Sequence, residues 1–225
     1  EGRKANPDWL LSFFNNPGII RPNLQVKMPS FHQIPDEDWD AIIAYFKHAD
    51  NEKISYRSDL ITDVSTENFK AGAKLHEIGQ CNSCHFYGEE FPTGDAPTWA
   101  PNLALSKERL NPEWVSEWLY SPSAIMPGTK MPAPYLPDNS VLTAEGAEND
   151  WGRDLISLGG DTTRMLDGLR DYIWNIKGST DIDAIIKDYF DKNGYDFDSN
   201  DEDEYDEDDD WDDDEDDDWG DDEDW

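Results

Sequence analysis

The chain has 225 residues, of which 52 are Asp or Glu and 18 are Lys or Arg, giving a net charge of −34. This charge argues against nucleic acid as a partner, because phosphates would be repelled, and favours partners with positive surface. Both cysteines lie in one pentapeptide, which excludes a disulfide framework. No apolar run reaches the roughly 20 residues of a membrane span, and the Glu at position 1 suggests a processed or truncated product.

The predicted elements are amphipathic helices, and no alternation typical of strands persists, so the fold class is mainly α. Asn6 can cap a first helix, which Pro17-Gly18 stops. Thr66 can cap the helix that precedes the cysteines. In chain order, helices are predicted after Asn6 and over 36–48, 66–79, 111–120, 164–177 and 181–191. Between them, 121–137 is a proline-rich loop and 138–163 is expected to be irregular.

An internal repeat relates the first residues to a later segment. Asn6-Pro7-Asp8-Trp9 matches Asn111-Pro112-Glu113-Trp114, and Lys27-Met28-Pro29 matches Lys130-Met131-Pro132. Each copy later ends in an amphipathic helix that contains Tyr45 or Tyr172. The first copy has no Cys-x-x-Cys-His before it, so it corresponds to the C-terminal half of the unit that 66–177 contains whole.

These observations divide the chain into five parts. They are a half-domain over 1–58, a linker over 59–65, a complete domain over 66–178, a short helix over 179–195 and an acidic tail over 196–225.

The pentapeptide Cys81-Asn82-Ser83-Cys84-His85 carries the chemistry. Its spacing lets two thiols add to the vinyl groups of a haem while His85 points its imidazole at the iron. A thioredoxin-like dithiol would need a βαβ context, and zinc would need two further ligands at similar spacing. The other histidines are His32, His48 and His76, and all are expected to be solvated or hydrogen-bonded. His76 is expected on a surface-facing position of its helix. The pattern therefore predicts one covalently bound haem c.

A thioether is a common second axial ligand in such a site and raises the reduction potential. The candidates are Met126, Met131 and Met165. Met165 lies on the apolar face of a predicted helix, where core packing is the simpler explanation. Met126 and Met131 share one loop, whose prolines would fix the backbone around a ligating sulfur.

Residues 66–177 resemble class I cytochrome c. The resemblance rests on Cys81–His85, on Gly72 in the preceding helix and on the stretch Pro127-Gly128-Thr129-Lys130-Met131-Pro132. It implies the class I cytochrome c fold, with Met131 as the second axial ligand. It also implies that the helices over 66–79 and 164–177 pack closely, at Gly72 and Tyr172. The stretch 133–161 is longer than a minimal cytochrome needs.

The first copy resembles multi-haem cytochromes of bacterial respiratory chains, through its stretch 20–29. The resemblance implies that Met28 is an axial ligand of a second haem, supplied by another segment. The alternative is that Met28 is a packing residue in a haem-free half-domain.

Electron transfer is the expected function, because iron with both His and Met bound has no open position for oxygen or peroxide. We expect no enzyme activity of its own, but a cytochrome subunit of a bacterial membrane respiratory complex with protein redox partners. The alternatives are a ligand-binding or catalytic haem, with the thioether off the iron, and a structural subunit. Since haem c is attached outside the cytoplasm, the expected location is periplasmic or otherwise extracytoplasmic.

The tail is a separate feature, in which 22 of the last 30 residues are acidic. Composition alone favours a solvated, disordered polyanion. Aromatic residues interrupt the acidic runs at Tyr205, Trp211, Trp219 and Trp225. We predict that the tail is an assembly tether, whose aromatics anchor it in a basic groove of a partner. Bound Ca²⁺ is the alternative way to neutralise the carboxylates.

Overall fold

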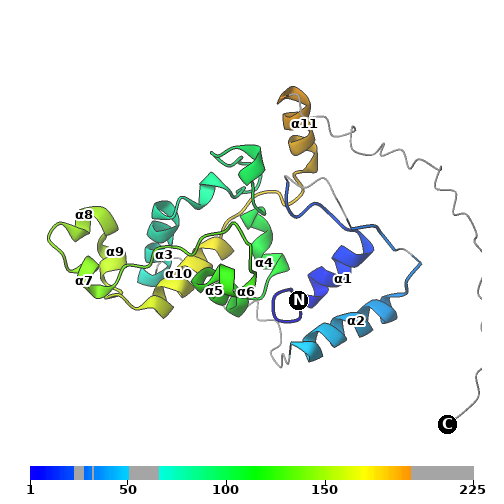
Figure 1. Cartoon of the computed structure of the whole chain (residues 1–225), viewed down its shortest axis with the longest axis horizontal. Coiled ribbons are helices and arrows are strands. Elements are labelled where there is room, and N and C mark those ends of the chain that lie inside the picture. Colours follow the sequence, from blue (N-terminus) through cyan, green and yellow to red (C-terminus); the bar gives the residue numbers. More distant parts are fainter. Residues whose placement is uncertain (23–27, 32, 51–65, 194–225) are drawn as a thin grey trace, which may run out of the picture.

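The computed structural model describes residues 1–22, 28–31, 33–50 and 66–193, and these are helical with connecting turns (Figure 1). This part of the chain has no strand, only isolated β-bridges, which confirms the mainly α fold class. None of its helices is long and apolar enough to cross a membrane. The predicted linker over 59–65 and the acidic tail lie outside the described residues.

All the predicted helices are present, with shifts of a few residues at their ends. The longer helices are α1 (Pro7–Asn15), α2 (Asp36–Ala49), α3 (Glu67–Ile78), α5 (Pro112–Tyr120), α10 (Thr162–Trp174) and α11 (Asp183–Asn193). The short ones are η1 (Cys81–Ser83), η2 (Ala96–Thr98), η3 (Leu103–Leu105), α4 (Ser106–Arg109) and α6 (Pro122–Ile125). The side chains of Asn6 and Thr66 cap α1 and α3, as predicted.

The sequence predicted an irregular stretch over 138–163, but this stretch holds three short helices. They are α7 (Asn139–Leu142), α8 (Ala147–Trp151) and α9 (Arg153–Ile156). Asp138 caps the first by accepting from the backbone N–H groups of Ser140 and Val141. Glycines with positive φ, including Gly146 and Gly152, separate the turns. Helices of four or five residues are too short to show a hydrophobic period, which is why the sequence did not reveal them.

Helices α3 and α10 cross at two glycines. A Cβ atom on Gly72 would lie 2.0 Å from the carbonyl oxygen of Gly168, and one on Gly168 would lie 2.0 Å from that of Asn68. On the same side of the crossing, the ring of Tyr172 contacts that of Phe69 with centroids 5.7 Å apart. The structure thus places Gly72 and Tyr172 at a close helix contact. A residue with a Cβ at Gly72 or at Gly168 would not fit into this contact.

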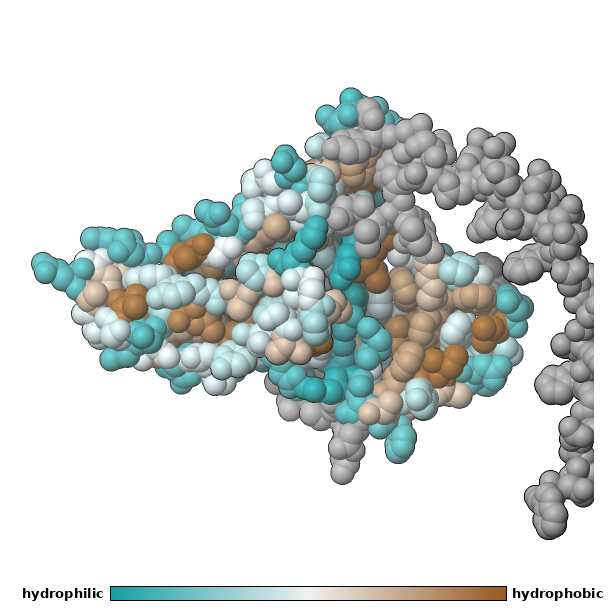
Figure 2. Space-filling view, in the orientation of Figure 1, coloured by the Kyte–Doolittle hydropathy of each residue, from teal (hydrophilic) through white to brown (hydrophobic). Residues whose placement is uncertain are grey.

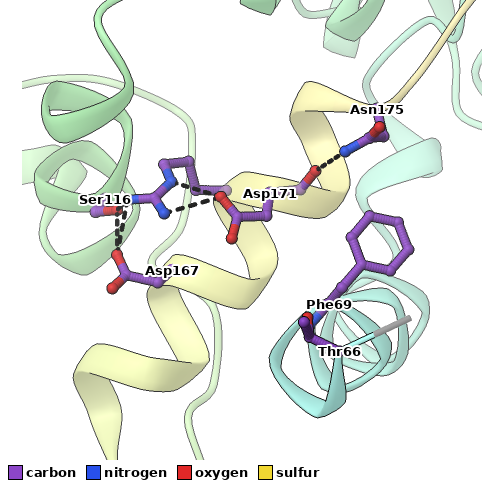
Figure 3. A network of polar contacts seen from close by, with 7 residues as sticks. Thr66, Phe69, Ser116, Asp167, Asp171 and Asn175 are labelled. Atoms are coloured by element: carbon purple, nitrogen blue, oxygen red, sulfur yellow. Dashed lines mark hydrogen bonds and ion pairs between the residues drawn. The ribbon is translucent and has the colours of Figure 1, made fainter. Parts of the chain in front are cut away.

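A polar network ties α10 to α5 (Figure 3). The guanidinium of Arg170 binds Asp167 at 2.9 Å and Asp171 at 2.8 Å. Ser116 of α5 donates to Asp167 at 3.2 Å. Asp171 is 4% exposed, so its pairing with Arg170 removes the cost of an isolated buried charge. The network fixes α5, which carries a residue of the candidate site.

Three clusters of buried hydrophobic residues hold the described chain together. The largest joins α3, α5 and α10 with the short helices α7 to α9. The second joins Phe86 and Trp99 to α11 through Ile186 and Phe190. The third holds α1 to α2 through Leu10 and Ile43. Hydrophobic surface is also visible over α1 and α2 (Figure 2).

The two repeat copies meet through reciprocal contacts. The backbone N–H of Asn6 donates to the carbonyl of Arg109, and that of Asn111 donates to the carbonyl of Lys4, both at 2.8 Å. The side chains repeat the exchange, Asn6 to Glu108 at 2.8 Å and Asn111 to Arg3 at 2.7 Å. Because Lys4 and Arg109 are themselves equivalent positions, the copies are related by a local two-fold axis, as in a symmetric dimer.

Cation–π contacts follow the same symmetry. Lys4 lies 5.8 Å from the ring centroid of Trp114, and Arg109 lies 5.4 Å from that of Trp9. Asn111 therefore binds the other copy instead of capping α5, where the sequence alone suggested only a helix start.

Candidate functional site

The chain turns sharply between α3 and the two cysteines. Gln80 has φ 48°, and it is the one residue other than glycine with positive φ in the described part of the chain. A short 3-10 turn, η1, follows at once, and the N–H of His85 donates to the carbonyl of Cys81 at 3.0 Å. The pentapeptide is thus one compact turn held at the end of α3.

The imidazole of His85 is oriented by a backbone carbonyl. Its Nδ1 lies 2.7 Å from the carbonyl oxygen of Pro101, an acceptor, so Nδ1 carries the proton and donates. The lone pair is therefore on Nε2, the arrangement by which proteins prepare histidine as a metal ligand. Burial lowers the pKa of His85, although the bond to Pro101 acts in the opposite direction. The ring is accordingly neutral at neutral pH, which metal ligation requires.

The two cysteines are free and half-buried. Burial, with a smaller effect of the neighbouring Cys84, raises the pKa of Cys81 to about 11. Cys81 is therefore a protonated thiol at neutral pH. Dithiol oxidoreductases use a cysteine with a lowered pKa, so the environment of Cys81 does not favour that chemistry.

Among the methionines of the second copy, Met131 is held by specific contacts. Trp118 of α5 donates from Nε1 to the sulfur of Met131 at 2.8 Å. The N–H of Met131 donates to the hydroxyl of Thr129 at 3.3 Å. Met126 is 39% exposed, and Met165 is fully buried in the core. Met131 is thus the half-buried, oriented sulfur, and sequence reasoning missed Trp118 although it lies one helical turn after Trp114.

The structure does not bring every predicted ligand together. Among the described residues, no hydrogen bond or ring contact joins Met131 to His85, so ligation by Met131 stays a prediction. Across the described ranges, no group of three His, Cys, Asp or Glu side chains could hold one metal ion. Met28 is half-buried, and the loop before it, 23–27, lies outside the described residues, so its role also stays a prediction.

We expected His76 on a surface-facing position of its helix, but it is buried beside the site. It is 6% exposed and its Nε2 lies 2.6 Å from the hydroxyl of Tyr87. Its ring also contacts that of Tyr172, with centroids 4.7 Å apart. The loop that brings Tyr87 over α3 is not visible from helix periodicity, which explains the error. The expected hydrogen-bonded role is confirmed, His48 is exposed, and His32 lies outside the described residues.

Burial of His76 predicts a pH dependence of stability. Burial, with a smaller effect of His85, lowers the pKa of His76 from 6.5 to about 4. The unfolded chain therefore binds a proton between these values that the folded chain excludes. As the pH falls from about 6.5 to about 4, the free energy of unfolding of the native chain, measured in urea, should fall by on the order of 2 kcal/mol relative to that of His76→Gln.

The exposed histidine of α2 supplies the control. His48→Gln should leave the pH dependence of the unfolding free energy as it is in the native chain. Equal pH profiles for His76→Gln and the native chain would contradict a neutral His76.

Comparison with known proteins gives one match among curated proteins. Cytochrome c oxidase subunit 2 of Bacillus subtilis (strain 168) is 34% identical over 92 residues, which cover 37% of this chain and 25% of that protein. The chain thus spans about a quarter of the length of this relative. No family model matches the chain, and no solved structure matches it.

These findings correct the cofactor expected from the sequence, one covalent haem c with a second haem near Met28. The relative is named as an oxidase subunit 2 and not as a c-type cytochrome. The described residues also bring no group of three His, Cys, Asp or Glu side chains together for a metal. The reason for the error is that the pentapeptide fixes the spacing of two sulfurs and an imidazole, but not the identity of the group that they hold.

Proposed function

We propose that the chain passes single electrons as part of a respiratory oxidase, by way of a metal centre at the pentapeptide. The observation that carries the proposal is the hydrogen bond of His85 to Pro101, which leaves a half-buried, neutral imidazole with its Nε2 lone pair available. The similarity to an oxidase subunit supports the respiratory setting. The chain then has no reaction of its own and acts through protein redox partners.

Each side chain has a separate task in this proposal. Cys81 and Cys84 would hold the centre, and His85 and Met131 would be its ligands, once the turn closes around the metal, since the described side chains do not yet form a group of three around one ion. Thiolate, thioether and imidazole are ligands that suit copper and iron, so metal binding would release the proton that Cys81 carries at neutral pH. Either metal cycles between two oxidation states that differ by one electron. Trp118 orients the sulfur of Met131, and Pro101 orients the ring of His85.

The fold and location belong to the same proposal. The crossing of α3 and α10 at Gly72 and Gly168 supports a class I cytochrome c-like arrangement of the second copy. We place the protein on the extracytoplasmic side, among the subunits of a membrane complex. The acidic tail, with its negative charge, then serves as the tether to a basic partner surface.

The test is the metal content and redox titration of the full chain. We expect about one copper or iron per chain and a reversible one-electron couple. Both should be lost in the double variant Cys81→Ser, Cys84→Ser and kept in Asn82→Ser, the matched control within the pentapeptide. A metal content that is the same in the double variant, or a chain with no reversible couple, would overturn the proposal. Porphyrin that stays bound to the chain on a denaturing gel would show that the bound group is a covalent haem.

The ligand role of Met131 predicts a shift of the reduction potential. Met131→Ala should lower the potential, because a thioether favours the reduced metal. Trp118→Phe should lower it less, since it removes only the N–H donor that withdraws electron density from the sulfur. Spectroelectrochemical titration measures both shifts, and the exposed Met126→Ala is the control. A larger shift for Met126→Ala than for Met131→Ala would show that the wrong sulfur has been assigned.

A further inference from the structure

The first repeat copy has a bare helix face where the second copy has a covered one. Aligning Tyr45 of α2 with Tyr172 of α10 places Ile42 at the position of Leu169. Leu169 is 1% exposed beneath α3, whereas Ile42 is 37% and Tyr45 is 66% exposed. The face of α10 that receives α3 is thus repeated on α2 with nothing described over it.

An open cavity lies beside α1, and Phe46 of α2 contributes to its lining. It has a volume of about 250 Å³ and is lined mainly by aromatic and aliphatic side chains, among them Trp9, Leu10, Phe13 and Phe46. By the repeat, Leu10 and Phe46 correspond to Val115 and Ile173, which are buried in the main core. The cavity and the bare face are both formed on α1 and α2, where Figure 2 shows hydrophobic surface.

The charges around the bare face identify what could cover it. In the second copy, Arg164 at the start of α10 binds the side-chain oxygen of Asn68 at 2.9 Å and lies 3.8 Å from Glu67. The alignment places the exposed Glu37 of α2 where α10 has Arg164. Helix α3 of a second copy would therefore bring Glu67 against Glu37, like charge against like.

We infer that Ala41, Ile42 and Tyr45 of α2 form a docking face for an amphipathic helix of a partner protein. The Cβ of Ala41, which replaces Gly168 on α2, would keep the backbones further apart than at the crossing of α3 and α10, so the partner helix carries a small residue where α3 has Gly72. About one turn earlier it carries Lys or Arg, which pairs with Glu37. Docking of this kind lays an apolar helix face into a hydrophobic groove, and it does not depend on the metal centre.

The test uses the full chain and two labelled peptides with the sequence of residues 66–79. One has the native sequence, and the other carries Glu67→Lys and Asn68→Lys; both are cross-linked between positions 70 and 74, because short helices are marginal in water. Fluorescence anisotropy should show saturable binding of the charge-inverted peptide, about tenfold tighter than the native peptide. The affinity should fall as salt is added.

Variants of the full chain locate the binding. Tyr45→Asp should weaken the binding of the charge-inverted peptide by about tenfold or more. Tyr120→Asp, at a tyrosine that is 63% exposed on α5, should leave this binding unchanged. Circular dichroism of both variants should match the native chain, because both side chains are exposed. Absence of saturable binding, equal binding of the two peptides, or undiminished binding to Tyr45→Asp would overturn the inference.

Sedimentation of the full chain separates a partner from a second copy. We expect no self-association that depends on Tyr45. A dimer that Tyr45→Asp dissociates and Tyr120→Asp does not would assign the face to a second copy and overturn the inference.

Discussion

Replacing Gly72 by Ala should strongly destabilise the protein. The added Cβ would lie 2.0 Å from the carbonyl oxygen and 2.1 Å from the carbonyl carbon of Gly168. Backbone atoms cannot rotate away as a side chain can, so α3 and α10 must separate along their whole contact. We expect a loss of about 3 kcal/mol or more in the free energy of unfolding, measured in urea.

A second glycine provides the control for this substitution. A Cβ on Gly18 would have no heavy atom within 4 Å, and its φ is not in the left-handed region. Gly18→Ala should therefore change the free energy of unfolding by less than about 0.5 kcal/mol. Similar losses for the two variants would contradict the close crossing of α3 and α10.

The sequence was most informative where one residue acts on its own neighbours. The caps at Asn6 and Thr66 and the helix-stopping Pro17-Gly18 depend on local backbone geometry, and the helices lie where these residues predict. The internal repeat was also visible, because four consecutive residues from Asn6 matched those from Asn111.

Contacts between distant segments could not be read from the sequence. The burial of His76 depends on Tyr87 and Tyr172, which come from a loop and from another helix. The donor to the sulfur of Met131 is Trp118, and helix periodicity alone gives it no role. Asn6 and Asn111 have the same sequence context and both donate to the other copy, but only Asn6 also caps its own helix. The sequence revealed neither of these bonds between the copies.

The assignment of the bound group shows a different limit. Spacing of Cys81, Cys84 and His85 predicts how two sulfurs and an imidazole are presented, and η1 with the His85–Pro101 bond presents them in one turn. The spacing does not decide which group such a turn holds.

Replacing His85 by Ala should have the largest effect on electron transfer. The substitution removes the one imidazole of the described site whose Nδ1 is bound to a backbone carbonyl and whose Nε2 can face a metal. Because an alanine offers no ligand, the oxidised and the reduced metal both lose a bond, and the centre should lose its defined potential. The fold should persist, since the buried core around α3 and α10 does not include His85.

Voltammetry of the full chain tests the central claim most directly. The account predicts one reversible one-electron wave for the native chain and for His48→Ala, at an exposed histidine of α2. It predicts no reversible wave for His85→Ala, with a circular dichroism spectrum like that of the native chain. A reversible wave of unchanged potential in His85→Ala, or no wave in the native chain, would contradict the account.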